Sequence, residues 1–229
     1  MSKKTTLVTN DNVFHTLERK HPRLMLAVAN EAHGTKFTGE EKVVLANDEH
    51  YLKNQRGEIR KTISDSHLII GEDAERFHFK CQSKPDGTMP RRMAEYGLEI
   101  ALENGKLTGD TYQIILPRAA VIFVTHTKNT PETFEVKLET ENGNTAHEIH
   151  TIKIQNYTID QLFSRQLFVL IPYHIWVYKN QFKVYNEDAE EIKKIQMIYA
   201  DIVNRLEEQV KRRTLGKDEY IDILDMSAR

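Results

Sequence analysis

The sequence has one cysteine, one tryptophan, six prolines and ten glycines among 229 residues. A single cysteine excludes an intramolecular disulfide framework and a cysteine-rich zinc site. The small share of glycine and proline excludes a collagen-like or low-complexity chain. No apolar run approaches the roughly 18 residues that a membrane-spanning helix needs, and the first residues lack the apolar core of a signal peptide. These absences predict a globular protein of the cytoplasm that has no contact with membranes.

An excess of charge of one sign is also missing. The chain has 32 lysines and arginines against 34 aspartates and glutamates, which gives a net charge of -2. A basic field over the whole surface, as in many nucleic-acid-binding proteins, is therefore excluded, and any site for an anion must be a local patch. The length suits one large domain or a domain with an appendage.

The first regular structure that the sequence predicts is a helix in two parts over residues 11–33. Asp11 can cap the first part, Pro22 suits the first turn of the second part, and Gly34 suits its end. The apolar residues of the second part recur at helical spacing, which places Glu31 near the buried face. A short strand is predicted at Lys42–Ala46.

A β-hairpin with a polar tip is predicted next, and it contains the candidate site. Its strands are Thr62–Ile70 and Arg76–Ser83, joined by a turn at Gly71–Glu75. Side chains alternate along a strand, so one face of the second strand has Phe77, Phe79 and Cys81, and the other has His78, Lys80 and Gln82. We expect Asp65, on the first strand, to converge with Lys80 and Gln82. An acid beside polar groups on neighbouring strands is typical of metal-dependent phosphodiesterases.

The remaining pattern predicts further helices and strands and a division of the chain. The predicted elements are a helix at Met89–Glu103, a central buried strand at Arg118–Val124, a hairpin of Thr133–Thr140 with Ala146–Gln155, a helix from Thr158 or Asp160 through Leu170 that Pro172 interrupts, and a long amphipathic helix at Asp188–Arg213. A boundary near Asn186 divides an α/β domain (1–185) from a C-terminal amphipathic helix and tail (186–229).

Several short motifs in this order resemble a known family. They are Thr62-Ile63-Ser64-Asp65-Ser66, then Lys80-Cys81-Gln82-Ser83, then Asp86, Met89, Arg92 and Tyr96. The chain resembles the PD-(D/E)XK nuclease-family transposases, also called the recombination-promoting nuclease family, over most of residues 10–180. The resemblance implies an α/β fold, a restriction-endonuclease-like mixed central sheet flanked by helices, here with a C-terminal helical appendage.

The resemblance also implies a function and a set of site residues. The expected activity is metal-dependent cleavage of double-stranded DNA in a transposition or recombination context, with Mg²⁺ or Mn²⁺ as the cofactor. Asp65 and the backbone carbonyl of Cys81 would hold the metal, and Gln82 would orient the water or the phosphate. The DNA backbone would be bound by Lys84, Arg91 and Arg92, since arginine holds phosphate bidentately and helix N-termini attract anions.

Lys80 departs from the family pattern, which has glutamate at that position. An ammonium group in place of a carboxylate removes a ligand and disfavours a cation nearby. Glu31 is the best replacement ligand, with Glu49 a weaker one. Alternatively, Lys80 and Asp65 form a structural ion pair, and the protein is a catalytically degenerate nuclease that acts as a DNA-binding or protein-interaction module.

Two other features carry weaker predictions. The apolar stripe of the C-terminal helix is expected to pack within the chain or to join two copies as a homodimer. His147 and His150, three residues apart in a strand, point to opposite faces and have no cysteine partner nearby. Zinc is therefore disfavoured there.

Overall fold

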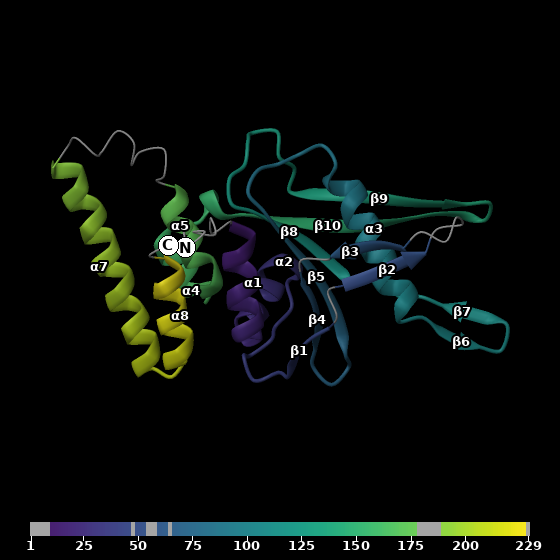
Figure 1. Cartoon of the computed structure of the whole chain (residues 1–229), viewed down its shortest axis with the longest axis horizontal. Helices are drawn as coiled ribbons and strands as arrows, with labels where there is room; N and C mark the ends of the chain where they lie inside the picture. Colours follow the sequence, from purple (N-terminus) through teal and green to yellow (C-terminus); the bar gives the residue numbers. More distant parts are fainter. Residues whose placement is uncertain (1–9, 47–48, 54–58, 64–65, 178–188, 228–229) are drawn as a thin grey trace, which may run out of the picture.

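A six-stranded mixed sheet forms the centre of the protein (Figure 1). The computed structural model describes residues 10–46, 49–53, 59–63, 66–177 and 189–227. The strand order is β1-β4-β5-β8-β10-β9, with bounds β1 Val43–Leu45, β4 Ser66–Ile70, β5 Glu75–Gln82, β8 Arg118–Phe123, β10 Gly143–Lys153 and β9 Thr133–Thr140. The pairs β5–β8 and β8–β10 are parallel and the other neighbours are antiparallel. The predicted mixed α/β architecture is confirmed.

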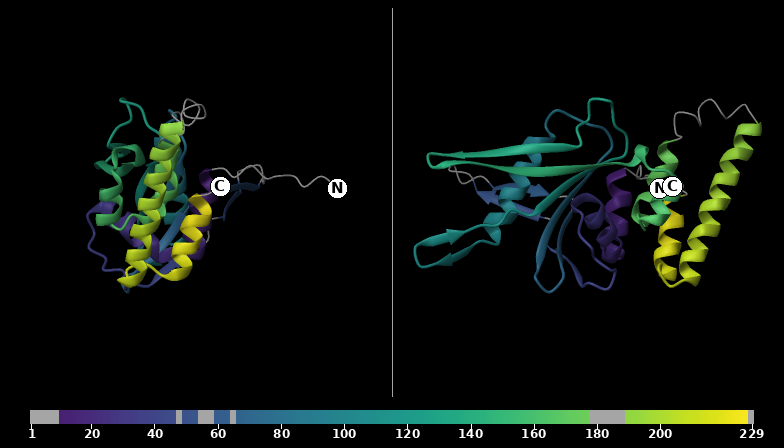
Figure 2. Two further views of the ribbon diagram at one scale, coloured as in Figure 1. Left: turned by 90° about the vertical axis from the view of Figure 1, so that its left-hand side faces the viewer. Right: turned by 180° about the vertical axis from the view of Figure 1, so that it is seen from behind.

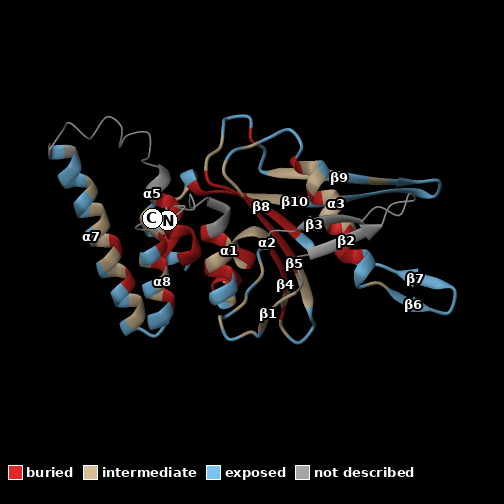
Figure 3. Cartoon of the chain, viewed as in Figure 1, coloured by how far each residue is buried: buried red, intermediate tan, exposed pale blue. Residues whose placement is uncertain are grey.

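The sheet has a separate apolar core on each face because side chains alternate along its strands. On one face, Phe77 and Phe79 pack with α1 (Asn10–Lys20) and α2 (Met25–His33). On the other face, Val121 and Phe123 pack with α3 (Met89–Glu103). The buried residues concentrate in the middle strands, as Figure 3 shows. The bounds of α3 and the central position of β8 agree with the prediction.

The two-part helix at the N-terminal end is confirmed, with one difference. A short 3-10 turn at Pro22–Leu24 separates α1 from α2, and Gly34 ends α2 with a φ of 64°. This left-handed conformation suits glycine because it has no Cβ. Asp11 lies inside α1, which includes Asn10, so it does not precede the helix as a cap.

The predicted strand Thr62–Ile70 was wrong as a single element. β3 (Ile59–Ile63) pairs with β2 (Glu49–Lys53) in a separate two-stranded sheet, whereas β4 belongs to the central sheet. The polar strands β2 and β3 pair with each other, and the apolar run of β4 enters the core. A further hairpin, β6 (Lys106–Thr108) with β7 (Thr111–Gln113), was not predicted and is exposed throughout.

Several short helices follow β10 and lead to two longer ones. These are η2 Ile154–Asn156, α4 Ile159–Ser164, η3 Phe168–Leu170, α5 Ile171–Val177, α7 Ala189–Lys211 and α8 Lys217–Ser227. Thr158 caps α4 through a capping box with Gln161, as the prediction allowed. The helix ends at Ser164, however, and does not reach Leu170. Pro172 lies in the first turn of α5, where its missing N–H costs nothing, so it begins a helix and does not interrupt one.

The C-terminal helix α8 packs against α1 and α5, and α7 packs on the outer side of α8 (Figure 2). The long helix agrees with the predicted one, whereas α8 was not predicted. Ile202, Leu206 and Ile223 belong to the same apolar cluster as Phe14 and Leu17 of α1. The division into domains at residue 186 stays a prediction, because residues 178–188 lie outside the described part of the chain. None of the helices within the described ranges has the length and apolar character needed to cross a membrane.

Ion pairs reinforce the contact between α8 and the N-terminal helices. Asp222 accepts hydrogen bonds from Lys20 Nζ and His21 Nε2, both at 2.7 Å, and Arg23 binds Glu219 through two nitrogens. The hydrogen bond from Lys20 lowers the pKa of Asp222, and His21 adds to the effect, while burial opposes it. Asp222 therefore remains charged at neutral pH.

Replacing Asp222 with asparagine should destabilise the fold at neutral pH and have less effect in acid. A carboxyl group whose pKa is lower in the folded state than in the unfolded state stabilises the folded state at any pH above the unfolded-state pKa. This contribution is lost as the pH falls through the folded-state pKa. We expect a loss of about 1 kcal/mol in the free energy of unfolding at pH 7. Thermal unfolding of both proteins at pH 7 and near pH 3 measures the difference. An equal difference at the two pH values would contradict the prediction.

Candidate functional site

The candidate site lies where the parallel strands β5 and β8 end, at the upper edge of the sheet in Figure 1. Carboxyl ends of parallel strands meet at one edge, which is where ligands bind in open α/β sheets. The two segments that leave this edge are joined: Thr125 donates to the carbonyl of Ser83 from its N–H (3.1 Å) and from its hydroxyl (2.7 Å). α3 begins at the same edge, at Met89.

Lys80 and Gln82 lie on the face of β5 that α3 covers. Lys80 is only 5% exposed, although it is a lysine. Gln82 Nε2 donates to Asp86 Oδ2 at 3.3 Å. The expected separation of the two faces of β5 is thus confirmed, since Cys81 is buried on the opposite face among phenylalanines. The predicted convergence with Asp65 stays a prediction, because Asp65 lies outside the described residues.

Asp86 organises the polar groups at this edge. Its Oδ1 accepts hydrogen bonds from the hydroxyl (2.7 Å) and the N–H (2.9 Å) of Thr88, and Arg92 Nη1 lies 3.5 Å from its Oδ2. The hydrogen bond from the Thr88 side chain lowers the pKa of Asp86, and the charges of Arg92 and Lys80 lower it further. Lys80 is thus close enough to act on Asp86. We expected Asp86 only as part of a motif, and its role as an acceptor was missed.

The predicted DNA-binding cations differ in their surroundings. Arg91 binds Glu95 at 2.9 Å, one turn along α3, and Arg92 binds Asp86. Lys84 is exposed in the segment between β5 and α3, and Lys128 is exposed in the segment after β8. Within the described part of the chain, neither lysine takes part in an ion pair. Lys128 was not predicted; only the structure joins its segment to that of Lys84.

Glu31 is not brought together with Lys80 and Gln82. It lies on α2, which packs on the opposite face of the sheet. Its Oε1 accepts hydrogen bonds from the hydroxyl of Tyr157 at 2.7 Å and from Arg165 Nη1 at 2.5 Å. Burial and this hydrogen bond raise the pKa of the Tyr157 hydroxyl. Glu31 therefore holds a structural position between α2 and the segment after β10.

The histidines of β10 lie near a third histidine at the end of α2. The rings of His33 and His150 are 5.1 Å apart between centroids, and burial lowers the pKa of His33 to about 4. Among the residues that the structure describes, no group of three or more histidines, cysteines and acids is arranged to hold a metal ion. The predicted ligands Asp65 and Glu49 lie outside the residues whose side chains the structure describes.

Comparison of the chain with protein-family models, with curated proteins and with solved structures gives no match.

Proposed function

We propose that this protein binds duplex DNA through the phosphate backbone at the edge where β5 and β8 end. The observation that carries the proposal is the pair Lys84 and Lys128, exposed on two segments that Thr125 and Ser83 hold together. Neither lysine has a carboxylate partner among the described residues, so their charge is available to phosphates. The helix α3, which is 15 residues long, begins at the same edge, and its N-terminus adds a partial positive charge there.

Lys80 is the reason for proposing binding rather than cleavage. Cleavage by a nuclease of this type needs acidic ligands for a hard cation. A unit charge 4 Å from a like charge costs about 4 kcal/mol at an effective dielectric near 20. The buried ammonium of Lys80 would impose such a cost on a cation beside it. Asp86, a described acid whose pKa the charge of Lys80 lowers, already accepts hydrogen bonds from Thr88 and Gln82.

The second candidate is a metal-dependent DNA endonuclease of the PD-(D/E)XK transposase type. The element order supports it: α2, β1, the β4–β5 hairpin, α3 and β8 follow one another as a restriction-endonuclease-like fold implies. In this case Asp65 and the Cys81 carbonyl would hold Mg²⁺ or Mn²⁺, which would polarise the phosphate and supply an attacking hydroxide. Gln82 would orient the water or the phosphate. In this second candidate, two copies of the chain would associate as a homodimer through the C-terminal helix.

Reversing the charge of both lysines should weaken DNA binding. We expect the double variant Lys84→Glu/Lys128→Glu to bind a duplex at least tenfold more weakly at low salt, because two phosphate contacts become repulsive. The slope of log affinity against log salt should fall by about 2, close to one unit for each contact. Fluorescence anisotropy with duplexes of two unrelated sequences measures both quantities, and the loss should be the same for both sequences.

A matched control separates a local patch from net charge. Lys106→Glu/Lys193→Glu makes the same change of charge at two exposed lysines on β6 and α7. Binding should be nearly unchanged in this control. If both double variants lose affinity equally, or if neither does, the proposed edge does not bind DNA.

A further inference from the structure

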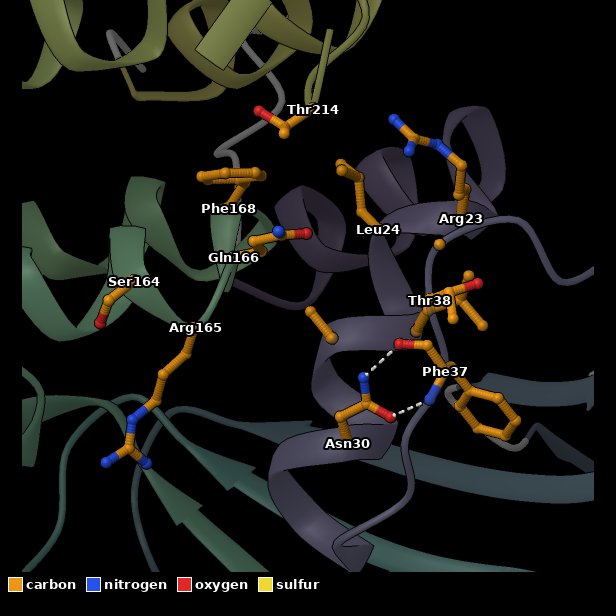
Figure 4. Close-up of a pocket in the computed structure, with 13 residues that line it drawn as sticks. Arg23, Leu24, Asn30, Phe37, Thr38, Ser164, Arg165, Gln166, Phe168 and Thr214 are labelled. Atoms are coloured by element: carbon orange, nitrogen blue, oxygen red, sulfur yellow. Dashed lines mark hydrogen bonds between the residues drawn. The ribbon is translucent and has the colours of Figure 1, made fainter. Parts of the chain in front are cut away.

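A cavity of about 230 Å³ lies between α2, with the turn that precedes it, and the segment from the end of α4 to η3 (Figure 4). Its walls come from the 3-10 turn at Pro22–Leu24 and α2, the chain that follows α2, the segment from the end of α4 to η3, and the connection from α7 to α8. Its lining includes Arg23, Ala27, Thr38, Arg165, Gln166 and Phe168. The cavity thus joins parts of the chain that are far apart in sequence.

The lining includes two arginines and no acidic residue. Arg23 and Arg165 lie at opposite ends in Figure 4. Their carboxylate partners, Glu219 and Glu31, are not among the residues that line the cavity. A guanidinium has five N–H donors, and a carboxylate engages at most a few of them. The two acids therefore fix the position of the arginines and leave other donors available. Both arginines are nearly half exposed.

Gln166 adopts a backbone conformation that favours glycine. Its φ is 57°, and it follows the end of α4, where the N–H of Leu167 bonds to the carbonyl of Leu162 at 2.8 Å. Glycine is the usual residue in this left-handed position because a side chain there is strained. The Gln166 side chain extends from the turn toward Leu24 on the opposite wall (Figure 4). Strain at such a position is often retained where the side chain has a function.

We infer that this cavity binds a small organic anion, a phosphate or carboxylate with a compact apolar body. Arg23 would bind the anionic group, since the Arg165 side chain points away from Gln166 in Figure 4, and the Gln166 amide would donate to that group or to a neighbouring oxygen. Leu24, Ala27 and Phe168 would contact the apolar body. Such a ligand would contact α2 and the segment from the end of α4 to η3 at once. This inference does not depend on the proposed function, because the two sites share no residue.

Isothermal titration with phenyl phosphate tests the inference. Inorganic phosphate and phenol supply the two halves separately, and benzoate replaces the phosphate with a carboxylate. We expect phenyl phosphate or benzoate to bind the native protein at least tenfold more tightly than either half. No binding of phenyl phosphate and benzoate at millimolar concentration would overturn the inference, as would inorganic phosphate binding equally well.

The variant Gln166→Gly distinguishes a ligand contact from a role in the turn. Glycine relieves the strained φ, so the melting temperature should stay the same or rise by a few degrees. Affinity for the bound probe should nevertheless fall at least tenfold. Ala74→Gly is the matched control, since Ala74 also has a positive φ, of 52°, and is not part of the lining. It should leave affinity unchanged. Unchanged affinity in Gln166→Gly would show that Gln166 only ends the helix.

Discussion

Replacing Lys80 with glutamate should convert the edge of the sheet into a site for Mn²⁺. The native protein is expected to bind Mn²⁺ weakly, because the buried ammonium repels it, and the variant clearly better. Without metal, Lys80→Glu should be less stable than the native protein, since a carboxylate would be buried where Lys80 now acts on Asp86. Added Mn²⁺ should then raise the melting temperature of the variant by mass action and leave that of the native protein nearly unchanged.

The variant should also nick supercoiled DNA in the presence of Mg²⁺ or Mn²⁺. Lys80→Met is the control, because it removes the ammonium and adds no ligand; it should not gain activity. The alternative from the sequence is that Glu31 already replaces the missing acid. Glu31→Gln would then abolish an activity that the native protein has. Because Glu31 is hydrogen-bonded to Tyr157 and Arg165 on the opposite face of the sheet, we expect Glu31→Gln to leave DNA cleavage unchanged. Absence of metal binding in native protein and Lys80→Glu would remove the nuclease candidate.

Truncating Leu206 to alanine should destabilise the whole protein. Leu206 is fully buried on α7, in one apolar cluster with Phe14 and Leu17 of α1. Removing a buried leucine side chain costs about 2–5 kcal/mol, because apolar contacts are lost and a cavity remains. Since this cluster reaches the central sheet, we expect one cooperative unfolding transition that moves to lower denaturant concentration. Circular dichroism of helix content and fluorescence of Trp176 should give the same midpoint.

Ile192 supplies the control for this prediction, since it lies on the same helix and is 41% exposed. Ile192→Ala should change the free energy of unfolding by about 0.5 kcal/mol or less. If Leu206→Ala instead produces an early transition that affects only part of the helix signal, the C-terminal helices unfold as a separate unit. The domain boundary expected near Asn186 would then be correct.

Local patterns correctly predicted the helices and strands whose own residues show a clear hydrophobic period. The stripe of Met93, Ile100 and Ala101 and the alternation of Phe77, Phe79 and Cys81 fix α3 and β5, because each pattern matches one period and one buried face. α8 was missed since its buried residues, among them Ile223 and Met226, face a core assembled from the other end of the chain. The role of Pro172 was predicted wrongly because proline can either begin a helix or interrupt one. The sequence did not show that α4 ends at Ser164, well before Pro172.

The candidate site was predictable only in part for a similar reason. Alternation along β5 places Lys80 and Gln82 on one face without any tertiary information. The position of Glu31 could not be predicted this way, because the helical pattern gives a face of α2 but not the face of the sheet that α2 covers. Lys128 could not be found either. It joins Lys84 only through the contact of Thr125 with Ser83, between segments about 40 residues apart.

The contact of α8 with the N-terminal helices has a consequence for how the protein is made. Lys20 and Asp222 are 202 positions apart. At typical rates of synthesis, Lys20 leaves the ribosome roughly 10–40 s before its partner exists. Throughout that interval the part of α1 that α8 later covers is exposed, and after Lys153 has been made the central sheet is already complete in sequence. Final closure must therefore wait until α8 has been made, and the unfinished protein is a natural client for chaperones that shield apolar helices.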